Sequence, residues 1–400
     1  MNYINLYNLK LSVMKFITQQ RLILNTVIII ILLSCNYDFN RKNEINLLSI
    51  ENRKLSLSDF ADSIKYIPLD GTILIKFINK IEIDDSLFII STSPDGILIF
   101  NYDGKLVRKI GKIGRGPSEY LNGVNFTIDK LKNNILVYNG MGNVLKYDYL
   151  GNYLGNFSLP TEITIGKIDF YNATLMISYP LITSKVKQCS QFLIIDSLAN
   201  IIIDQKNTNY FFTSDALSFT STLTYYFKNN VHYWNQYNDT IYQLDNSLIK
   251  KKYILKKGKY KLTPEFVSNI KDFKNLENFI VIRDILESRK YLFFIYDLFN
   301  RQNLTIYNKE AQITFSTIKL DNNEFRLIND LDNGVSFCPQ IIFERNGNEY
   351  MAMEVGSYEL LEHIKDINLS NKSSSLELRR LSYSLNENDN PLLMLVRLKN

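Results

Sequence analysis

A pattern of two alternating apolar runs around a polar turn recurs along the chain, and it limits the folds that the chain can adopt. Residues 96–110 (GILIFNYDGKLVRKI) align with residues 143–157 (NVLKYDYLGNYLGNF), 47 positions later, so that Gly104 matches Gly151. Alternation with a period of two residues is typical of strands that bury one face. Asp-Gly, Leu-Gly and Asn-rich turns between such runs are typical of β-hairpins. Each copy therefore predicts a set of antiparallel strands.

Further copies extend the repeat through most of the chain. Asp196 follows Asp148 of the second copy by 48 positions, Asp245 follows Asp196 by 49, and a fifth copy is expected at residues 304–315. Units of roughly 40–50 residues with several strands each are typical of propeller blades. A parallel α/β fold would need amphipathic helices between its strands, and the first 330 residues show almost none.

The two ends of the chain supply the remaining blade. Residues 64–69 (IKYIPL) and 390–399 (NPLLMLVRLK) have strand patterns, and residues 335–355 supply the other strands. Pairing both ends in one blade would close the ring and remove an open sheet edge. Residues 357–366 (SYELLEHIKD) predict a short helix, followed by a polar surface loop to about residue 390. We therefore expect an all-β fold, a six-bladed β-propeller closed by its N- and C-terminal strands, with a short helix near the C-terminus.

The composition agrees with this fold and excludes one class of partner. The chain has 26 Tyr and 24 Phe but only 16 Gly and 8 Pro, and aromatic side chains favour strands. The net charge of +5 comes from 46 basic and 41 acidic residues that are spread along the chain. Nucleic-acid binding would need a concentrated basic face. We expect no nucleic-acid partner.

The N-terminus predicts export and attachment to a membrane. Lys15 and Arg21 precede an apolar run of about a dozen residues, which suits the core of a signal peptide better than a membrane span. Residues 32–35 (LLSC) resemble a lipobox, the signal of bacterial lipoproteins. That resemblance implies that Cys35 is lipidated and becomes the mature N-terminus. A short anchor helix with an incidental cysteine is the alternative.

These features give a domain organisation. We expect a lipoprotein signal peptide at residues 1–35, an N-terminal tether at 36–61 and the propeller at 62–400, with a helical and loop insert at about 357–390.

The stretch GKIGRGPSEY, residues 111–120, suggests a phosphate-binding loop, but its context does not. A dinucleotide-binding loop lies between a strand and a helix, whereas a proline and another strand pattern follow here. We predict an inter-blade connection in which glycines permit a tight path and Tyr120 anchors the loop in the core. In propellers the inter-blade loops lie on one face, near the central channel, so we expect this loop there, where Arg115 could clamp a carboxylate or a sugar acid with Glu119 beside it. An ion pair between Arg115 and Glu119 that braces the loop is the favoured alternative.

Three further residues are candidates for ligand binding. Trp234, the single tryptophan, and Asn235 belong to an aromatic and amide cluster of the kind that stacks on sugars or peptides. Packing of Trp234 between blades is the favoured alternative. Arg283 precedes a very apolar strand, where an ion pair with Asp284 is the alternative to ligand binding.

Residues for catalysis and metal binding are few. The chain has two histidines, His232 and His363, and it lacks a G-x-S-x-G elbow and a zinc-ligand set. Cys189 and Cys338 are not in a C-x-x-C pair, and we expect both to be buried. We predict no catalytic residue, no metal ligand and no cofactor. A calcium site built from Asp and Asn oxygens stays open as an alternative, although no EF-hand spacing is present.

Three stretches carry a family resemblance: LSDFADSIKYIPLD (57–70), DGKLVRKIGKIGRGPSEY (103–120) and NENDNPLLMLVRLK (386–399). They resemble the six-bladed β-propeller lipoproteins common in Bacteroidota, which are relatives of the NHL-repeat propellers. Ser118 stands where the commonest form of the loop motif has glycine. The resemblance implies the propeller fold and implies little about activity.

Export, a ring architecture and the lack of an assembled catalytic constellation together favour one function. We expect a lipid-anchored, non-catalytic binding or scaffold protein of the bacterial cell envelope, whose partner is a glycan, a peptide or an envelope protein. One alternative is a metal-dependent hydrolase or lactonase at the channel mouth, and another is an accessory lipoprotein that docks on an outer-membrane transporter. Oxygens that converge on one point of the channel would favour the enzyme, and an aromatic-lined groove would favour binding.

Overall fold

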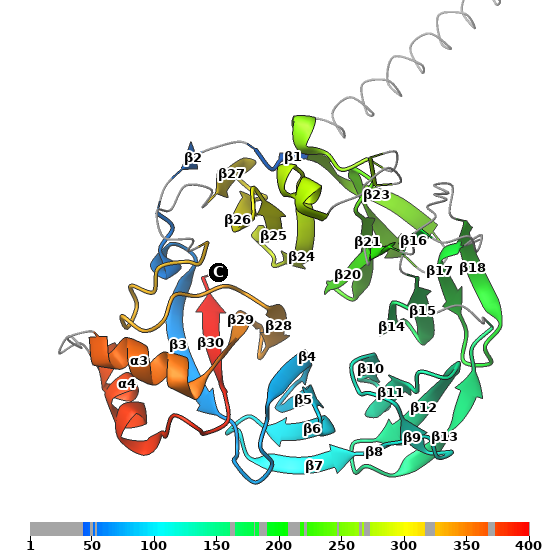
Figure 1. Ribbon diagram of the computed structural model, residues 1–400, viewed down its shortest axis with the longest axis horizontal. Helices are drawn as coiled ribbons and strands as arrows, with labels where there is room; N and C mark the ends of the chain where they lie inside the picture. The colour runs from blue at the N-terminus through cyan, green and yellow to red at the C-terminus, as the bar shows by residue number, and fades with distance from the viewer. Residues whose placement is uncertain are drawn as a thin grey trace, which may run out of the picture.

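Six sheets of at least four strands each are arranged around a ring (Figure 1). The computed structural model describes residues 43–48, 51–52, 54–160, 165–179, 181–183, 190–206, 217–219, 222–245, 248–263, 266–267, 273–316, 325–366 and 373–399. The predicted all-β, six-bladed β-propeller is confirmed. Among the described residues, no helix is both long enough and apolar enough to span a membrane.

Blades 1 to 3 follow one another along the chain, each running from an inner to an outer strand. Blade 1 comprises β4 (Phe77–Asp84), β5 (Leu87–Ser93), β6 (Gly96–Asn101) and β7 (Leu106–Ile110). Blade 2 comprises β10 (Phe126–Asp129), β11 (Asn134–Tyr138), β12 (Asn143–Asp148) and β13 (Tyr153–Ser158). Blade 3 comprises β14 (Lys167–Tyr171), β15 (Thr174–Ser178), β17 (Ser190–Ile195) and β18 (Ile201–Lys206).

Blades 4 to 6 complete the ring. Blade 4 comprises β20 (Thr222–Phe227), β21 (Asn230–Asn235), β22 (Thr240–Asp245) and β23 (Leu248–Lys256). Blade 5 comprises β24 (Val281–Glu287), β25 (Tyr291–Leu298), β26 (Arg301–Asn308) and β27 (Ile313–Ser316), which confirms the fifth copy. Blade 6 comprises β28 (Ile341–Arg345), β29 (Asn348–Val355), β30 (Leu392–Leu398) and β3 (Ala61–Pro68).

The ring closes where the two ends of the chain pair. Strand β3 runs antiparallel to β30, so that Ile64 is paired with Val396 and Pro68 with Leu392. Strand β29 pairs with the other edge of β30. The closing strands were predicted from the sequence, and the pairing confirms them. Because the last blade contains both ends of the propeller, neither end can leave without opening the ring.

The repeated turn has the same chemistry in successive blades. The side-chain oxygens of Asn101, Asp148 and Asp196 each accept a hydrogen bond from the backbone N–H four residues later. Gly104 and Gly151 follow in these turns with φ of +79° and +86°, which a side chain would strain. The spacing of the repeat therefore reflects the recurrence of one hairpin.

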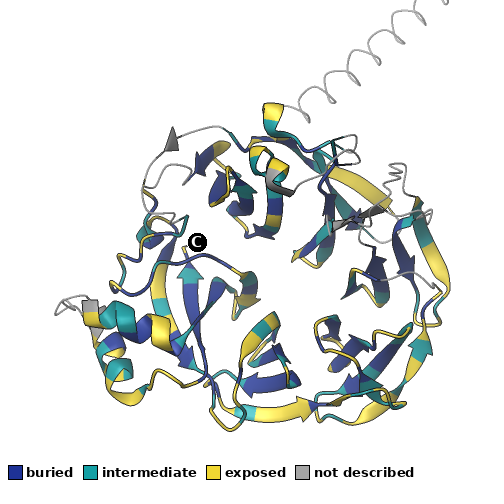
Figure 2. Ribbon diagram, viewed as in Figure 1, coloured by how far each residue is buried: buried dark blue, intermediate teal, exposed yellow. Residues whose placement is uncertain are grey.

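Apolar side chains fill the seams between blades, as the dark strands of Figure 2 show. Phe126 of blade 2, for example, packs in one cluster with Ile89 of blade 1, and Leu136 of blade 2 packs with Ile177 of blade 3. Each sheet buries both faces because a neighbouring blade covers each of them. The core is thus a ring of seams around the channel.

Part of the segment that we expected to be a tether belongs to the propeller. Strand β1 (Glu44–Asn46) pairs in parallel with β23, and β2 (Glu51–Asn52) pairs in parallel with β27. Ile45 and Leu47 are fully buried, which anchors this segment to blade 4. The segment therefore covers the outer edges of two blades, which would otherwise expose unpaired backbone groups.

The insert between β29 and β30 contains two helices. The predicted helix is present as α3 (Ser357–Asp366), but α4 (Ser373–Ser384) occupies part of the stretch that we expected to be a loop. Leu378 is fully buried in the core of blade 6, and Leu381 and Leu385 pack against it. The spacing of Leu378 and Leu381 places them on one face of α4, and Leu385 continues that face just after the helix ends, so the burial of that face explains the second helix.

Candidate functional site

The loop at residues 111–120 is a brace between blades 1 and 2. The Tyr120 hydroxyl is fully buried and donates to the carbonyl oxygen of Ile110, while Ile97 N–H donates to it at 3.2 Å. This anchoring role was predicted. Strand β8 (Lys112–Ile113) lies at the outer perimeter of the ring in Figure 1, so the expected position near the channel is wrong.

The ion pair that we favoured in this loop is absent. The Glu119 carboxylate instead accepts a hydrogen bond from Gly116 N–H at 2.8 Å and lies against Gly114, where a side chain would overlap it. Arg115 is exposed, and none of the ion pairs among the described residues includes it. Glu119 therefore stabilises the turn through its contacts with Gly114 and Gly116, and the exposed Arg115 side chain takes no part in that stabilisation.

Trp234 and Asn235 are both about 1% exposed. The Trp234 ring packs in the seam between blades 4 and 5, its Nε1–H donates to the Asn238 carbonyl at 2.9 Å, and the Lys257 ammonium lies 5.2 Å from its centroid. The Asn235 Oδ1 atom accepts from the backbone N–H groups of Tyr237 and Asn238. Trp234 thus has the packing position that the sequence favoured, and Asn235 fixes a turn.

Arg283 is exposed on β24 and pairs with Asp297 at 2.5 Å, not with the adjacent Asp284. A bulge between Ile282 and Asp284 changes the register of β24 against β25 and explains the difference. Burial raises the pKa of Asp284 to about 6, and Lys167 opposes the shift.

The structure does not bring the five predicted binding residues together, and Cys35 and Cys189 lie outside the described residues. Cys338 is buried, as expected, and is not in a disulfide.

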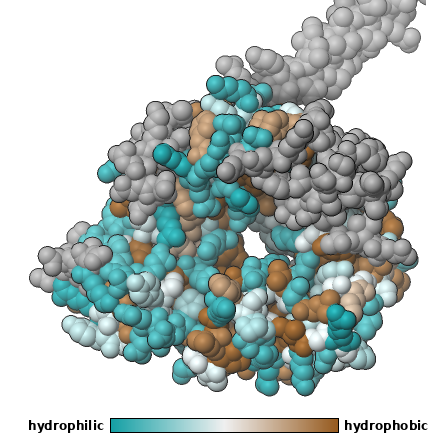
Figure 3. All heavy atoms as spheres, in the orientation of Figure 1, coloured by the Kyte–Doolittle hydropathy of each residue, from teal (hydrophilic) through white to brown (hydrophobic). Residues whose placement is uncertain are grey.

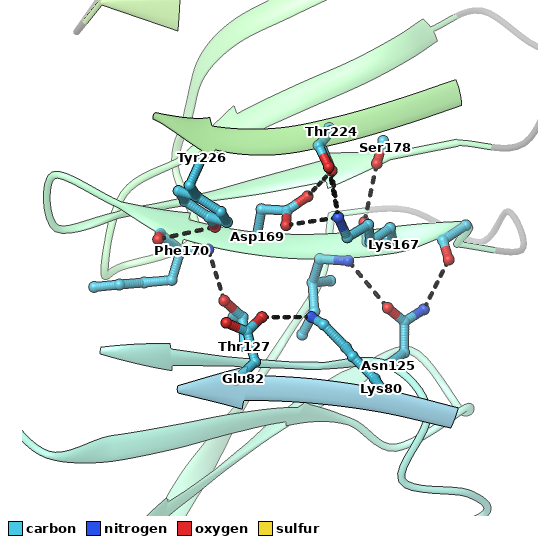
Figure 4. A network of polar contacts seen from close by, with 12 residues as sticks. Lys80, Glu82, Asn125, Thr127, Lys167, Asp169, Phe170, Ser178, Thr224 and Tyr226 are labelled. Atoms are coloured by element: carbon cyan, nitrogen blue, oxygen red, sulfur yellow. Dashed lines mark hydrogen bonds and ion pairs between the residues drawn. The ribbon is translucent and has the colours of Figure 1, made fainter. Parts of the chain in front are cut away.

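Polar side chains of the innermost strands bond across the seams at the channel wall (Figure 4). The Lys80 ammonium of blade 1 donates to the Phe126 carbonyl of blade 2. The Asn125 amide joins blade 2 to blade 3, because it donates to the Gly166 carbonyl and accepts from Ile168 N–H, both at 3.1 Å. An innermost strand has no strand partner on its channel side, so these side chains satisfy backbone groups that would otherwise depend on water.

The same wall continues from blade 3 to blade 4. The Lys167 ammonium lies 2.7 Å from Thr224 Oγ1 and 3.2 Å from Asp169, and Thr224 donates to Asp169 at 2.6 Å. The Tyr226 hydroxyl donates to the Phe170 carbonyl at 3.1 Å. The space-filling view shows an opening near the centre of the ring, so the channel is not filled from this face (Figure 3). The polar groups at this part of the wall are engaged in holding the blades together.

A buried charged cluster joins blades 4 and 5. Glu287 is fully buried and accepts hydrogen bonds from Tyr225, Tyr253 and Lys309 at 2.9–3.0 Å. The His232 ring stacks on Tyr225 with 4.7 Å between centroids, and burial lowers the pKa of His232 to about 4. Among the described residues, no group of three or more His, Cys, Asp and Glu side chains is placed to hold a metal ion.

A pocket of about 330 Å³ lies on the seam between blade 6 and blade 1. Its lining is Ser63, Lys65, Tyr102, Arg345, Tyr350, Leu395 and Arg397. The β3–β30–β29 register brings part of this wall together, because Arg397 is paired with both Ser63 and Tyr350. Tyr102 follows β6 and is the only lining residue from blade 1. The pocket therefore exists only in the closed ring.

Stacked aromatic pairs fix the walls of this seam pocket. Tyr102 stacks on Phe88 with 5.2 Å between centroids, and Tyr350 stacks on Phe343 with 5.4 Å. The Arg345 guanidinium carbon lies 3.5 Å from the Tyr102 centroid. Burial raises the pKa of Tyr102, and Arg345 opposes that shift. The rings and the guanidinium are thus held in place before any ligand arrives.

The seam pocket carries an excess of positive charge. Three of its lining residues are cations and none is a carboxylate. Arg397 pairs with Asp62 at 2.7 Å, but no ion pair joins Lys65 or Arg345 to a carboxylate in the part of the chain that is described. Glu344, the residue before Arg345, is engaged by Arg289 at 2.9 Å. A guanidinium and an ammonium that form no direct ion pair can bind a carboxylate, sulfate or phosphate group.

Sequence reasoning missed this pocket because its residues come from both ends of the propeller. The one available signal was the predicted pairing of β3 with β30, which places Ser63 and Lys65 beside Leu395 and Arg397. The position of Tyr102 against Arg345 depends on ring closure, which no local pattern reports.

Comparisons with known proteins agree with the fold. Residues 42–397 match the family described as "Domain of unknown function (DUF4934)". The chain is similar to the crystal structure of a "Putative exported protein" from Bacteroides fragilis NCTC 9343, with a TM-score of 0.69 and 18% identity over 89% of this chain and 99% of that one. It also matches the β-propeller domain of Cps50 (Swd1) from Myceliophteria thermophila, with a TM-score of 0.38 and 12% identity over 71% of this chain and 96% of that one. No curated protein matches.

The family match spans most of the chain, from the residue before the first described segment to the penultimate residue of the closing strand β30. The chain belongs to the DUF4934 family.

Proposed function

We propose that this protein is a non-catalytic binding protein of the bacterial cell envelope, tethered through a lipid on Cys35, and that its seam pocket takes a small anionic ligand. One observation carries the proposal: Lys65 and Arg345 line a preformed pocket, both lie over the Tyr102 ring, and neither forms an ion pair with a carboxylate among the described residues. Exposed cations usually gain such partners or point into solvent, whereas here aromatic faces hold them.

The ligand class follows from the lining. The cations suit a carboxylate, sulfate or phosphate group, and the Tyr102 and Tyr350 rings offer apolar faces to the carbon skeleton that carries it. A sugar acid or sulfated sugar has both features. The envelope location is supported by the apolar run before Cys35 and by the similarity to a protein described as exported.

Calorimetric titration with three sets of oligosaccharides tests the proposal: uronic-acid, sulfated and neutral. We expect binding of an acidic set, weakening with salt, and no binding of the neutral set. Arg345→Ala should weaken binding about tenfold or more, which corresponds to about 1.4 kcal/mol.

Arg108→Ala is the matched control, because Arg108 is an exposed arginine on β7 outside the pocket lining. Its affinity should equal that of the unchanged protein. Equal binding of neutral and acidic sugars, or unchanged binding by Arg345→Ala, would refute the proposal.

A further inference from the structure

The N-terminal segment enters the propeller at the outer edge of blade 4. Strand β1 lies in parallel beside β23, and the Asn43 carbonyl accepts a hydrogen bond from Ile254 N–H at 2.9 Å. Eight positions separate Cys35 from Asn43, which an extended chain spans in about 28 Å at most. A lipid on Cys35 therefore keeps this edge close to the membrane.

This edge is rich in lysine, so the positive charge is less evenly spread along the chain than we expected from its composition. Seven lysines and no acidic residue lie between positions 246 and 263: Lys250, Lys251, Lys252, Lys256, Lys257, Lys259 and Lys261. Their carboxylate partners are Asp239, Asp245 and Glu44, so seven ammonium groups face three carboxylates. Lys251 and Lys259 are exposed and take part in none of the ion pairs among the described residues. We name residues 248–261 the blade 4 edge.

Exposed apolar side chains stand beside these lysines. Leu248 is 60% exposed and Ile249 is 37% exposed at the start of β23. A surface that combines lysines with a few exposed apolar side chains suits the headgroup region of a membrane, where lysine binds phosphate and the apolar groups reach the acyl boundary.

We propose that the blade 4 edge lies against an anionic phospholipid surface and fixes the orientation of the propeller. The inference rests on the anchoring part of the proposed function. Blade 1 lies across the ring from blade 4, with β7 at the opposite perimeter from β23 (Figure 1). The seam pocket, between blades 6 and 1, then faces away from the membrane, where a soluble ligand can reach it.

Blade 1 supplies an internal control, because its outer strand is also basic. Lys105 in the turn before β7 and Lys112 on β8 just after it are exposed, and neither forms an ion pair with another described residue. If positive charge alone set the orientation, blade 1 would compete with blade 4. The short chain from Cys35 to β1 selects blade 4, since it enters the propeller there.

Depth-dependent fluorescence quenching on vesicles tests the orientation. The full, lipidated chain is reconstituted into vesicles of phosphatidylcholine with or without phosphatidylglycerol, with a nitroxide on the lipid headgroup as quencher. A single fluorophore is placed at Ile249→Cys on blade 4 or at Val107→Cys on blade 1, both in a Cys189→Ser background. Val107 is a matched site, because it is 48% exposed on the outer strand β7.

With phosphatidylglycerol we expect the label at 249 to be quenched at least threefold more than the label at 107, and the difference to shrink in 0.5 M salt. Lys251→Glu with Lys259→Glu should remove most of the difference, whereas Lys105→Glu with Lys112→Glu should not. Equal quenching at both sites, or quenching that is the same with and without phosphatidylglycerol, would contradict the proposed orientation of the propeller. Neither result would affect the proposal on ligand binding. A chain that does not remain with the vesicles overturns the anchor and this inference together.

Discussion

Arg345 of blade 6 lies over the ring of Tyr102 of blade 1, with 3.5 Å between the guanidinium carbon and the ring centroid. The contact crosses the seam where the ring closes, because blade 6 contains both ends of the propeller and blade 1 is the next blade along the chain. The stacked cation both joins two blades and presents its N–H groups to the seam pocket.

Tyr102→Leu should release Arg345 from this position. We expect ligand affinity to fall about tenfold and the free energy of unfolding to fall by about 1 kcal/mol, because the cation–π contact and the stack on Phe88 are both lost. Tyr102→Phe keeps the ring and is the control. Titration calorimetry and urea denaturation measure the two effects, and equal behaviour of the Leu and Phe variants would contradict the role of the ring.

Gly104→Ala should destabilise the protein far more than Gly142→Ala. Both glycines have positive φ, +79° and +89°, so both substitutions cost roughly 1–2 kcal/mol in backbone strain. A Cβ at Gly104 would also overlap the carbonyl oxygen of Pro68, whereas nothing lies within 4 Å at Gly142. In urea denaturation we therefore expect Gly104→Ala to lower the free energy of unfolding by roughly 1–3 kcal/mol more than Gly142→Ala does. Similar losses for both variants would show that the contact between blades 1 and 6 yields easily.

His232 should make stability depend on pH below neutrality. Its folded-state pKa is about 4, against 6.5 for an unperturbed histidine, so the folded state prefers the neutral ring. The stability that this provides is fully present above pH 6.5 and is lost as the pH falls towards 4. The loss is on the order of 3 kcal/mol over that window.

His232→Phe keeps an aromatic ring to stack on Tyr225 and cannot titrate. Urea denaturation at several pH values should therefore give a shallower fall between pH 6.5 and 4 for this variant. Parallel pH profiles for the two proteins would assign the acid sensitivity to other groups. Asp284 is not one of them, because burial raises its pKa and its protonation therefore favours the folded state as the pH falls.

Lys309→Met should leave Glu287 buried without its cation. Glu287 has no exposed side-chain surface, and Lys309 is its only cationic partner in the ion pairs among the described residues. Removing one partner of such a pair costs about 3 kcal/mol or more in unfolding free energy. Lys132→Met, at an exposed lysine outside these ion pairs, should change stability by less than about 0.5 kcal/mol. If Lys309→Met lowered the free energy of unfolding no more than Lys132→Met, the hydrogen bonds from Tyr225 and Tyr253 would be enough to stabilise the buried Glu287.

The architecture was predictable because it follows from local, repeated chemistry. The turn at Asn101 recurs at Asp148 and Asp196, and each copy predicts two strands and the hairpin between them. Closure by β3 and β30 followed from the strand patterns at both ends of the chain. Helix α4 was missed although Leu378, Leu381 and Leu385 have helical spacing, because the polar residues around them obscured the pattern.

The candidate site was not predictable in the same way. Tyr102 and Arg345 are more than 200 positions apart, and only the closed ring brings them together. The partner of Arg283 depends on a bulge in β24 that shifts the register by one residue. The sequence identifies residue types that can bind ligands, but it does not show which of them are accessible in the folded protein. Trp234 and Asn235 are of such types, yet both are buried and cannot contact a ligand.

The pairing of β1 with β23 determines how the molecule carries mechanical load. A pull on the residues before Asn43 first meets the hydrogen bonds between β1 and β23, and next those between β2 and β27. The bridge from Ser56 to Ile328, with the buried Leu55 and Leu57 beside it, comes next, and only then does the force reach β3 in the closing blade. The N-terminal segment thus protects ring closure from a pulling force: β1 and β2 can detach from the edges of blades 4 and 5 before force acts on the β3–β30 pairing that closes the ring.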